Sequence, residues 1–410
     1  MRKLGAALGV GLGLCGAVSA PAQDSAGNGK TFADRWTLSA DARARYQSVD
    51  RDRASDGKAL TVRLAGRAEV AVSPRLRVLA EGETVLALND DFDDGLRRNG
   101  RPFVPDPDGI ELNRLQIEAE LAPKTRVTVG RQSLALDDWR FIGVLPFRQN
   151  QQSFDAARLE FPVRTLLGAG LVDAGYIGRV NRPLSNRNPF GQFEGDSLFV
   201  NYNTPSPLGR VTLYHYRLDL VTGPDTARSD VSNRVTGARL FGRRHWDGFG
   251  LIWDAAYARQ TDHAGNARDF AADYVLAELT AEPGRWDVAV RFEALGAGDG
   301  VGFQTPLASL HRFQGLADQF LQTPADGVRD SSVTLRRDFA DIGPVTGIRA
   351  LARHHWFDAA TDGRSYGREL DIVVGGRVGS LRLDLEYADY RADSFRVDAR
   401  SLALSLSCSL

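Results

Sequence analysis

Apolar and polar residues alternate one by one along almost the whole chain, and this period of two restricts the possible folds most. In segment 36–46, the apolar Trp36 and Leu38 alternate with the charged Asp41 and Arg43. Successive side chains of a β-strand point to opposite sides, so such a segment is a strand with one apolar and one charged face. About eighteen segments fit this description, many near the length that crosses a bilayer when tilted: 36–46, 60–72, 76–88, 110–121, 125–132, 154–161, 170–180, 196–203, 210–220, 233–242, 249–260, 270–281, 286–293, 330–339, 347–357, 367–378, 381–387 and 395–410.

The connections between these segments differ in length according to which end of the strands they join. Long polar loops are expected at 49–58, 89–109, 133–152, 181–195, 221–232 and 296–329, with short turns such as 73–75, 122–124, 282–284 and 342–344 between them. A soluble β-sandwich has no reason to keep its long loops at one end. An outer-membrane barrel does, because its periplasmic turns are short and its outer loops are long.

The charged faces decide between a soluble β protein, which is the alternative, and a membrane barrel. A barrel of about 18 strands encloses a lumen too wide for side chains to fill, so water reaches its inner face. The charged faces then line the lumen and the apolar faces meet lipid. The predicted fold class is therefore all-β, a transmembrane antiparallel up-and-down β-barrel. Aromatic residues at the two membrane interfaces are expected to form girdles, with candidates Trp36, Tyr46, Tyr214, Tyr216, Tyr257 and Trp286.

The first residues have the pattern of a secretory signal peptide. Arg2 and Lys3 precede an apolar run over 4–18, and 20–22 reads Ala-Pro-Ala, a small-x-small cleavage pattern. We expect a signal peptide at 1–22 and one barrel domain at 23–410. Secretion and a barrel together predict the outer membrane of a Gram-negative cell, where lipid and lipopolysaccharide surround the protein.

The charges nearly cancel, with 51 basic and 52 acidic residues, so net charge gives no reason to expect nucleic-acid binding. Only four of the basic residues are lysines, at positions 3, 30, 58 and 124. A genome that favours arginine codons explains this bias, and so does a need for planar guanidinium groups, which bind carboxylates through two parallel hydrogen bonds.

Segment 129–161 holds the most specific chemistry, because arginine, aspartate and amide side chains crowd its central loop. General porins narrow their lumen with an inward-folded loop at this place in the chain, and rings of arginine select anions. The predicted pore-constriction residues are Arg131, Arg140, Arg148, Arg158, Asp138 and Asp155. The predicted arginines of the pore wall are Arg43, Arg45, Arg63, Arg67, Arg114, Arg239, Arg291 and Arg353.

Catalytic and metal-binding patterns are missing from the sequence. It contains no GxSxG elbow, no HExxH and no phosphate-binding loop, and the adjacent His354 and His355 project to opposite faces of one strand. We therefore expect no catalytic residue, no metal and no cofactor. His311 and Asp318 are predicted to order the long loop at 296–329.

Two stretches resemble the alginate-export porin family of Gram-negative outer membranes. The first contains GRQ at 130–132, DDWRFIG at 137–143 and RQNQQSFDAARLEF at 148–161, and the second is FQTPLASLHRFQGLADQFLQTPADGVRD at 303–330. The resemblance implies an eighteen-stranded barrel whose arginine-rich constriction passes an anionic polysaccharide, which in the type member is a uronate polymer secreted from the periplasm. The expected function is passive diffusion of an anionic glycan or small anionic solutes. The alternative is a barrel enzyme or adhesin that acts through its long outer loops.

The C-terminus departs from the usual barrel pattern. The barrel-assembly machinery, an expected partner, commonly reads a terminal aromatic residue, whereas this chain ends in Leu410. We expect either less efficient assembly or another signal.

Overall fold

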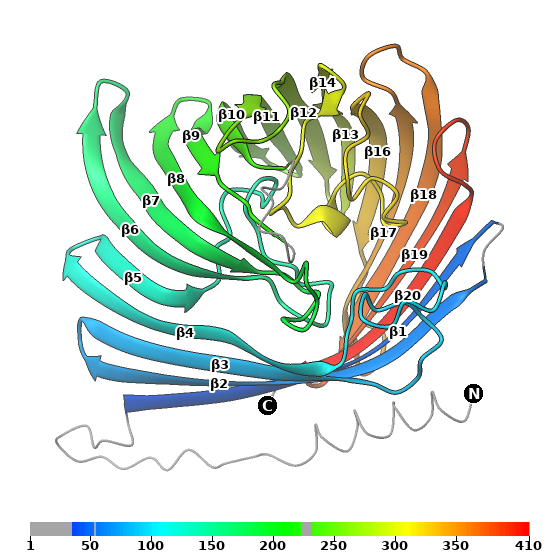
Figure 1. Cartoon of the computed structure of the whole chain (residues 1–410), viewed down its shortest axis with the longest axis horizontal. Helices are drawn as coiled ribbons and strands as arrows, with labels where there is room; N and C mark the ends of the chain where they lie inside the picture. The colour runs from blue at the N-terminus through cyan, green and yellow to red at the C-terminus, as the bar shows by residue number, and fades with distance from the viewer. Residues whose placement is uncertain (1–34, 53–54, 223–230, 410) are drawn as a thin grey trace.

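The computed structural model describes residues 35–52, 55–222 and 231–409, and it is a closed β-barrel (Figure 1). Eighteen strands form one sheet in which each strand is antiparallel to its neighbours, and β1 pairs with β20 to close the ring. The predicted signal peptide at 1–22 and the terminal Leu410 lie outside the described residues. The fold class predicted from the alternating pattern is confirmed, and so is the number of strands.

The strands agree with the eighteen predicted segments, and most extend beyond them. Their bounds are β1 Trp36–Arg51, β2 Gly57–Ser73, β3 Leu76–Ala87, β4 Gly109–Ala122, β5 Thr125–Gln132, β6 Ser153–Thr165, β7 Gly168–Asn181, β8 Gln192–Ser206, β9 Gly209–Leu218, β10 Asn233–Trp246, β11 Phe249–Asp262, β12 Ala271–Pro283, β13 Trp286–Leu295, β16 Val328–Asp338, β17 Val345–Asp358, β18 Ser365–Val378, β19 Leu381–Ala392 and β20 Ala399–Ser409. A small hairpin, β14 Ala297–Gly298 and β15 Val301–Gly302, and the 3₁₀ turn η2 Leu310–Arg312 lie in the loop between β13 and β16. No helix in the described part of the chain is long and apolar enough to cross a membrane.

The two faces of each strand differ as the alternation predicts. On β13, Val288, Val290 and Phe292 are exposed on the outside of the barrel, whereas Arg291 and Glu293 are ion-paired inside it. An apolar outer surface suits contact with lipid, and a charged inner surface suits contact with water.

Two expectations about the strand ends and faces are wrong. The loop predicted at 49–58 is much shorter, because Val49 pairs with Gly57 and the hairpin of β1 and β2 continues past the predicted ends. Tyr214 and Tyr216 do not belong to an interface girdle. Both are buried inside the barrel, where Phe141 packs against them with ring centroids 5.4 Å and 6.0 Å away.

The lumen contains two long loops, 133–152 between β5 and β6 and 303–327 between β15 and β16, which we call the early loop and the late loop (Figure 1). Their apolar residues form a buried cluster with the inner wall, in which Leu134, Ile142, Phe303 and Leu307 are almost completely buried. This cluster is a hydrophobic core inside the barrel, and it holds polar parts of both loops in the lumen.

Candidate functional site

The early loop folds inward and is joined to the late loop. Ile142 and Leu307 form a β-bridge, and the amide of Gly143 donates to the carbonyl of Leu307 at 2.9 Å. The side-chain amide of Gln152 donates to both carbonyls, that of Gly143 at 2.9 Å and that of Leu307 at 3.0 Å. The two loops therefore form one unit within the barrel.

Arg140 fixes the early loop to the far wall. Its Nε lies 2.9 Å from Oε1 of Glu293 on β13, and both side chains are only 1% exposed. Its Nη2 donates to Gln314 at 3.0 Å, and its guanidinium lies 4.4 Å from the ring centroid of Phe313. Such a buried pair holds a loop in place, and its arginine has no surface left for a passing solute.

Arg148 fixes the same loop to the late loop. Its Nη2 lies 2.6 Å from Oδ2 of Asp318, whose other oxygen lies 2.8 Å from Nδ1 of His311. Nε2 of His311 lies 3.1 Å from Glu386 on β19, and the ring of His311 stacks on Phe147 with centroids 3.6 Å apart. We call these five residues the loop clasp.

The charges of the loop clasp support one another. Burial alone would lower the pKa of His311, but the carboxylates of Asp318 and Glu386 outweigh burial and raise the pKa to about 9. Burial would raise the pKa of Asp318, but His311 and Arg148 outweigh it and lower the pKa to about 2. His311 is therefore a cation at neutral pH and Asp318 an anion.

Carboxylates on β18 hold the backbone of the late loop. The amide of Ala317 donates to Glu369 at 2.7 Å and that of Leu316 to Asp371 at 3.3 Å. Gly315, with a φ of +83°, brings the chain so close that a Cβ would lie 2.5 Å from the carboxyl group of Glu369. A side chain would not fit there, so this position requires glycine.

The first two arginines of the predicted pore wall hold loops. Arg43 donates to Gln149 at 2.8 Å and to the carbonyl of Pro146 at 2.6 Å. Arg45 is buried and lies 2.6 Å from Asp106. Both therefore attach outer loops to β1.

Five more predicted arginines lie on strands and pair with carboxylates of the inner wall. Arg131 and Asp155, on β5 and β6, are 2.6 Å apart, and Arg158 lies 2.7 Å from Asp173. The early loop itself therefore carries only Asp138, Arg140 and Arg148 of the six predicted constriction residues. The remaining wall pairs are Arg63 with Asp41 and Glu83, Arg67 with Glu69, and Arg114 with Glu81.

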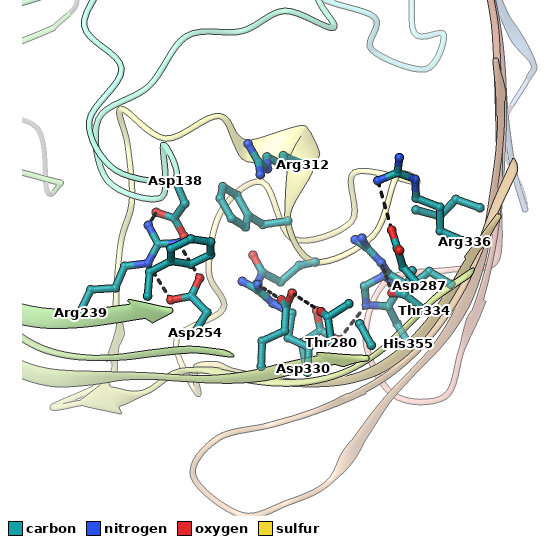
Figure 2. A pocket seen from close by; sticks show the side chains of 18 residues that line it. Asp138, Arg239, Asp254, Thr280, Asp287, Arg312, Asp330, Thr334, Arg336 and His355 are labelled. Carbon is teal, nitrogen blue, oxygen red and sulfur yellow. Dashed lines mark hydrogen bonds and ion pairs between the residues drawn. The ribbon is translucent and has the colours of Figure 1, made fainter. Parts of the chain in front are cut away.

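Two cavities lie between the inward loops and the wall formed by β10 to β20. The first, of about 310 Å³, is shown in Figure 2. Arg239 there contacts Asp254 at 2.5 Å and Asp138 of the early loop at 3.4 Å, and Arg291 pairs with Glu278 at 2.7 Å. The second cavity, of about 520 Å³, is lined by Phe147, His311 and Glu386 of the loop clasp and by residues of β1, β17, β18, β19 and β20.

Two arginines line both cavities, Arg312 from η2 and Arg353 from β17. Arg312 is exposed and projects over the strands, 5.1 Å from the ring centroid of Trp139. Arg353 donates to the hydroxyl of Thr334 at 2.8 Å. Among the described residues neither guanidinium has a carboxylate within ion-pair distance, so both can bind an anion in the lumen.

The second cavity carries an excess of positive charge. Five arginines and three carboxylates line it, together with His311. Arg349 and Arg382 share one of these carboxylates, Asp384, at 3.4 Å and 2.5 Å. Enclosure lowers the pKa of Arg312, and repulsion from Arg291, Arg239 and Arg353 adds to this effect although Asp138 opposes it. Positive charge is therefore concentrated around the border of the two cavities.

Sequence reasoning selected Arg353 but missed Arg312, Arg349 and Arg382. Arg312 directly follows His311 in the late-loop stretch, so its place on a loop expected near the pore could have indicated a cation in the lumen. Arg349 and Arg382 alternate with apolar residues on their strands and looked like other wall residues. Among the described residues, no group of His, Cys, Asp and Glu is arranged to hold a metal ion.

A closed eighteen-stranded barrel with loops folded into its lumen is the architecture of an outer-membrane porin. The sequence model of the family described as alginate export matches residues 34–309. The chain belongs to this family, as its two motif stretches predicted, and it is an outer-membrane protein of the Gram-negative type. No curated protein is similar enough in sequence to count as a relative.

Solved structures of outer-membrane channels have the same fold. OccK9 (OpdG) of Pseudomonas aeruginosa is 18% identical, with a TM-score of 0.69 over 93% of this chain and 100% of that one. OpdK of the same species, solved with vanillate, is 16% identical, with a TM-score of 0.68 over 91% and 98% of the two chains. OccAB4 of Acinetobacter baumannii is 14% identical, with a TM-score of 0.67 over 92% and 98%.

Proposed function

We propose that the protein is a passive, anion-selective channel for sugar acids or an anionic polysaccharide. Solutes pass the cavities beside the inward loops and contact Arg312 and Arg353 in turn. The unpaired state of these two guanidinium groups carries the proposal, because most of the other arginines inside the barrel are neutralised by carboxylates.

The chemistry of a guanidinium group favours carboxylate cargo. Arginine binds a carboxylate through two parallel hydrogen bonds, and conduction needs sites that bind weakly and repeatedly. Membership of the alginate export family and the vanillate in the similar OpdK barrel, itself a carboxylate, both support this class. No metal or nucleotide is needed for diffusion through a channel.

The test is the reversal potential of single channels in planar bilayers under a potassium chloride gradient. Replacing both arginines, in Arg312→Ser/Arg353→Ser, removes two positive charges from the cavities. At about 0.1 M salt the screening length is about 10 Å, so the fields of the two arginines still reach ions in the cavities. The reversal potential is expected to move toward that of a non-selective channel, with a several-fold lower preference for chloride.

A matched control removes two arginines that lie outside the lumen. Arg244 and Arg337 are on outward faces at the periplasmic end, each stacked on a tryptophan ring, so Arg244→Ser/Arg337→Ser should leave the reversal potential unchanged. Equal reversal potentials in all three proteins would refute the role of Arg312 and Arg353. If the unmodified barrel shows no conductance, the result would contradict the proposed channel function and favour an enzyme or adhesin acting through its outer loops.

A further inference from the structure

Two arginines face each other on the outer surface of the barrel. Arg217 on β9 and Arg234 on β10 are directly paired in the sheet register, and both are exposed. Opposite residues of antiparallel strands have Cβ atoms about 5 Å apart, and like charges in this position destabilise the sheet. An anion bound between the two side chains would remove this repulsion.

Both side chains point away from the lumen. Their neighbours Tyr216, Leu218 and Val235 are buried inside the barrel, and alternation sends the side chains of Arg217 and Arg234 to the other face. Leu218 ends β9 and Asn233 begins β10 at the outer end of the barrel, where the long loops lie. The two arginines therefore meet the surroundings of the barrel near its outer rim.

The sheet register also gives the depth of the two arginines in the membrane. Leu213, Ala238 and Tyr257 form one row across β9, β10 and β11, and all three are exposed on the outside. The next outward-facing row toward the rim is polar, with His215 and Thr236, and the one after it contains Arg217 and Arg234. At about 3.3 Å per residue, the arginines lie about 13 Å along the strands beyond the apolar row, which suits lipid headgroups.

No residue in the described part of the chain neutralises this pair. Within the described ranges, neither guanidinium forms a hydrogen bond or an ion pair. The contrast is Arg259, on the same face of β11, which pairs with Asp273 at 3.1 Å. The pKa of His263, in the loop after β11, is lowered by burial and then by Arg217 and Arg234, while Asp219 and Asp262 oppose this. The positive charges of Arg217 and Arg234 therefore both act on His263, although Asp219 and Asp262 lie nearby.

We propose that Arg217 and Arg234 form a binding site for a phosphate group of lipopolysaccharide in the outer leaflet. A phosphate offers several acceptor oxygens, and two guanidinium groups can each donate a pair of hydrogen bonds to it. The lipid chains of the same molecule then cover the apolar row of Leu213, Ala238 and Tyr257. The site is independent of the cargo, because it lies on the opposite side of the wall from the cavities.

The experiment measures binding of lipid A to the purified full-length barrel in detergent by thermophoresis. Lipid A with both phosphates is compared with dephosphorylated lipid A and with inorganic phosphate. Because the double substitution removes charge-assisted hydrogen bonds to the phosphate, Arg217→Gln/Arg234→Gln should weaken binding of phosphorylated lipid A at least about tenfold. Dephosphorylation should weaken binding to the unmodified protein by a similar factor.

The control is Arg244→Gln/Arg337→Gln, which removes two outward arginines at the periplasmic end of the same barrel. This variant should bind lipid A with the affinity of the unmodified protein. Unchanged single-channel conductance of Arg217→Gln/Arg234→Gln shows that the variant is folded and keeps this result separate from the transport proposal. The proposal is overturned by equal affinity for the two forms of lipid A, by an equal loss in the control variant, or by inorganic phosphate binding that lipid A does not displace.

Discussion

Arg140 and Arg312 lie on different inward loops and have opposite environments. Arg140 is buried against Glu293, whereas Arg312 is exposed in the lumen. Breaking a buried ion pair leaves an uncompensated charge, while an exposed arginine costs little to replace. We therefore expect Arg140 to stabilise the early loop, and we propose solute contact for Arg312.

Replacing Arg140 tests this assignment. Arg140→Met leaves Glu293 buried, with Arg291 as the remaining ion-pair partner among the described residues, at 3.3 Å, and we expect a loss of about 3 kcal/mol in the free energy of unfolding. Urea unfolding in detergent measures the change. In a double-mutant cycle, Arg140→Met/Glu293→Gln should lose less than the sum of the single variants.

The control for that measurement is Arg126→Met, whose half-exposed side chain lies 3.6 Å from Glu118. An exposed pair contributes only about 0–1 kcal/mol. If Arg140→Met costs no more than Arg126→Met, or if the cycle shows simple additivity, the assignment of Arg140 as a loop anchor is wrong.

At the scale of elements, the loop clasp holds the late loop, and its titration gives a pH dependence. The pKa of His311 is about 9 in place and 6.5 when the ring is free, so its stabilisation is complete below pH 6.5 and is lost as pH rises through 9. The pKa of Asp318 falls from 3.8 to about 2, so its contribution is complete above pH 3.8 and is lost as pH falls through 2. The clasp is strongest between about pH 4 and 6.5.

Single-channel recordings between pH 6 and 10 should therefore show more current fluctuation at the alkaline end, as the late loop loosens. His311→Gln cannot titrate in this range, so its recordings should already be noisy at pH 6 and change little up to pH 10. An alkaline increase of the same size in His311→Gln would assign the effect to other groups.

The elements could be predicted from the sequence because a strand pattern is local. Alternation located all eighteen strands, but it did not show that the pairing of β1 with β2 extends to Val49 and Gly57. Tyr214 and Tyr216 alternate like girdle residues, yet the ring of Phe141, more than seventy residues earlier, covers them inside the barrel. The partner of Arg140 is Glu293, which no local pattern indicates. The charged character of the inner wall could therefore be predicted, whereas Arg312 was missed and the pairing of the charges depended on the folded loops.

At the scale of the whole molecule, the proposed anionic cargo predicts how oligosaccharides of different charge block the channel. Uronate oligomers of increasing length, added on one side of the bilayer, should interrupt the current for longer as more carboxylates contact Arg312 and Arg353. Neutral oligosaccharides of equal length should interrupt it briefly or not at all. Equal block by both kinds would contradict anionic glycan as the cargo, and Arg312→Ser/Arg353→Ser should shorten only the uronate block.

The inward loops are fastened to strands from nearly the whole length of the chain. The early loop is held by Arg43 on β1 and by Glu293 on β13, and the late loop by Glu386 on β19. Contacts between residues so distant in sequence form late in folding, because the intervening chain must be ordered first. The interior of this protein is therefore completed only as the barrel closes, and a partly assembled barrel has a wide interior without its inward loops in place.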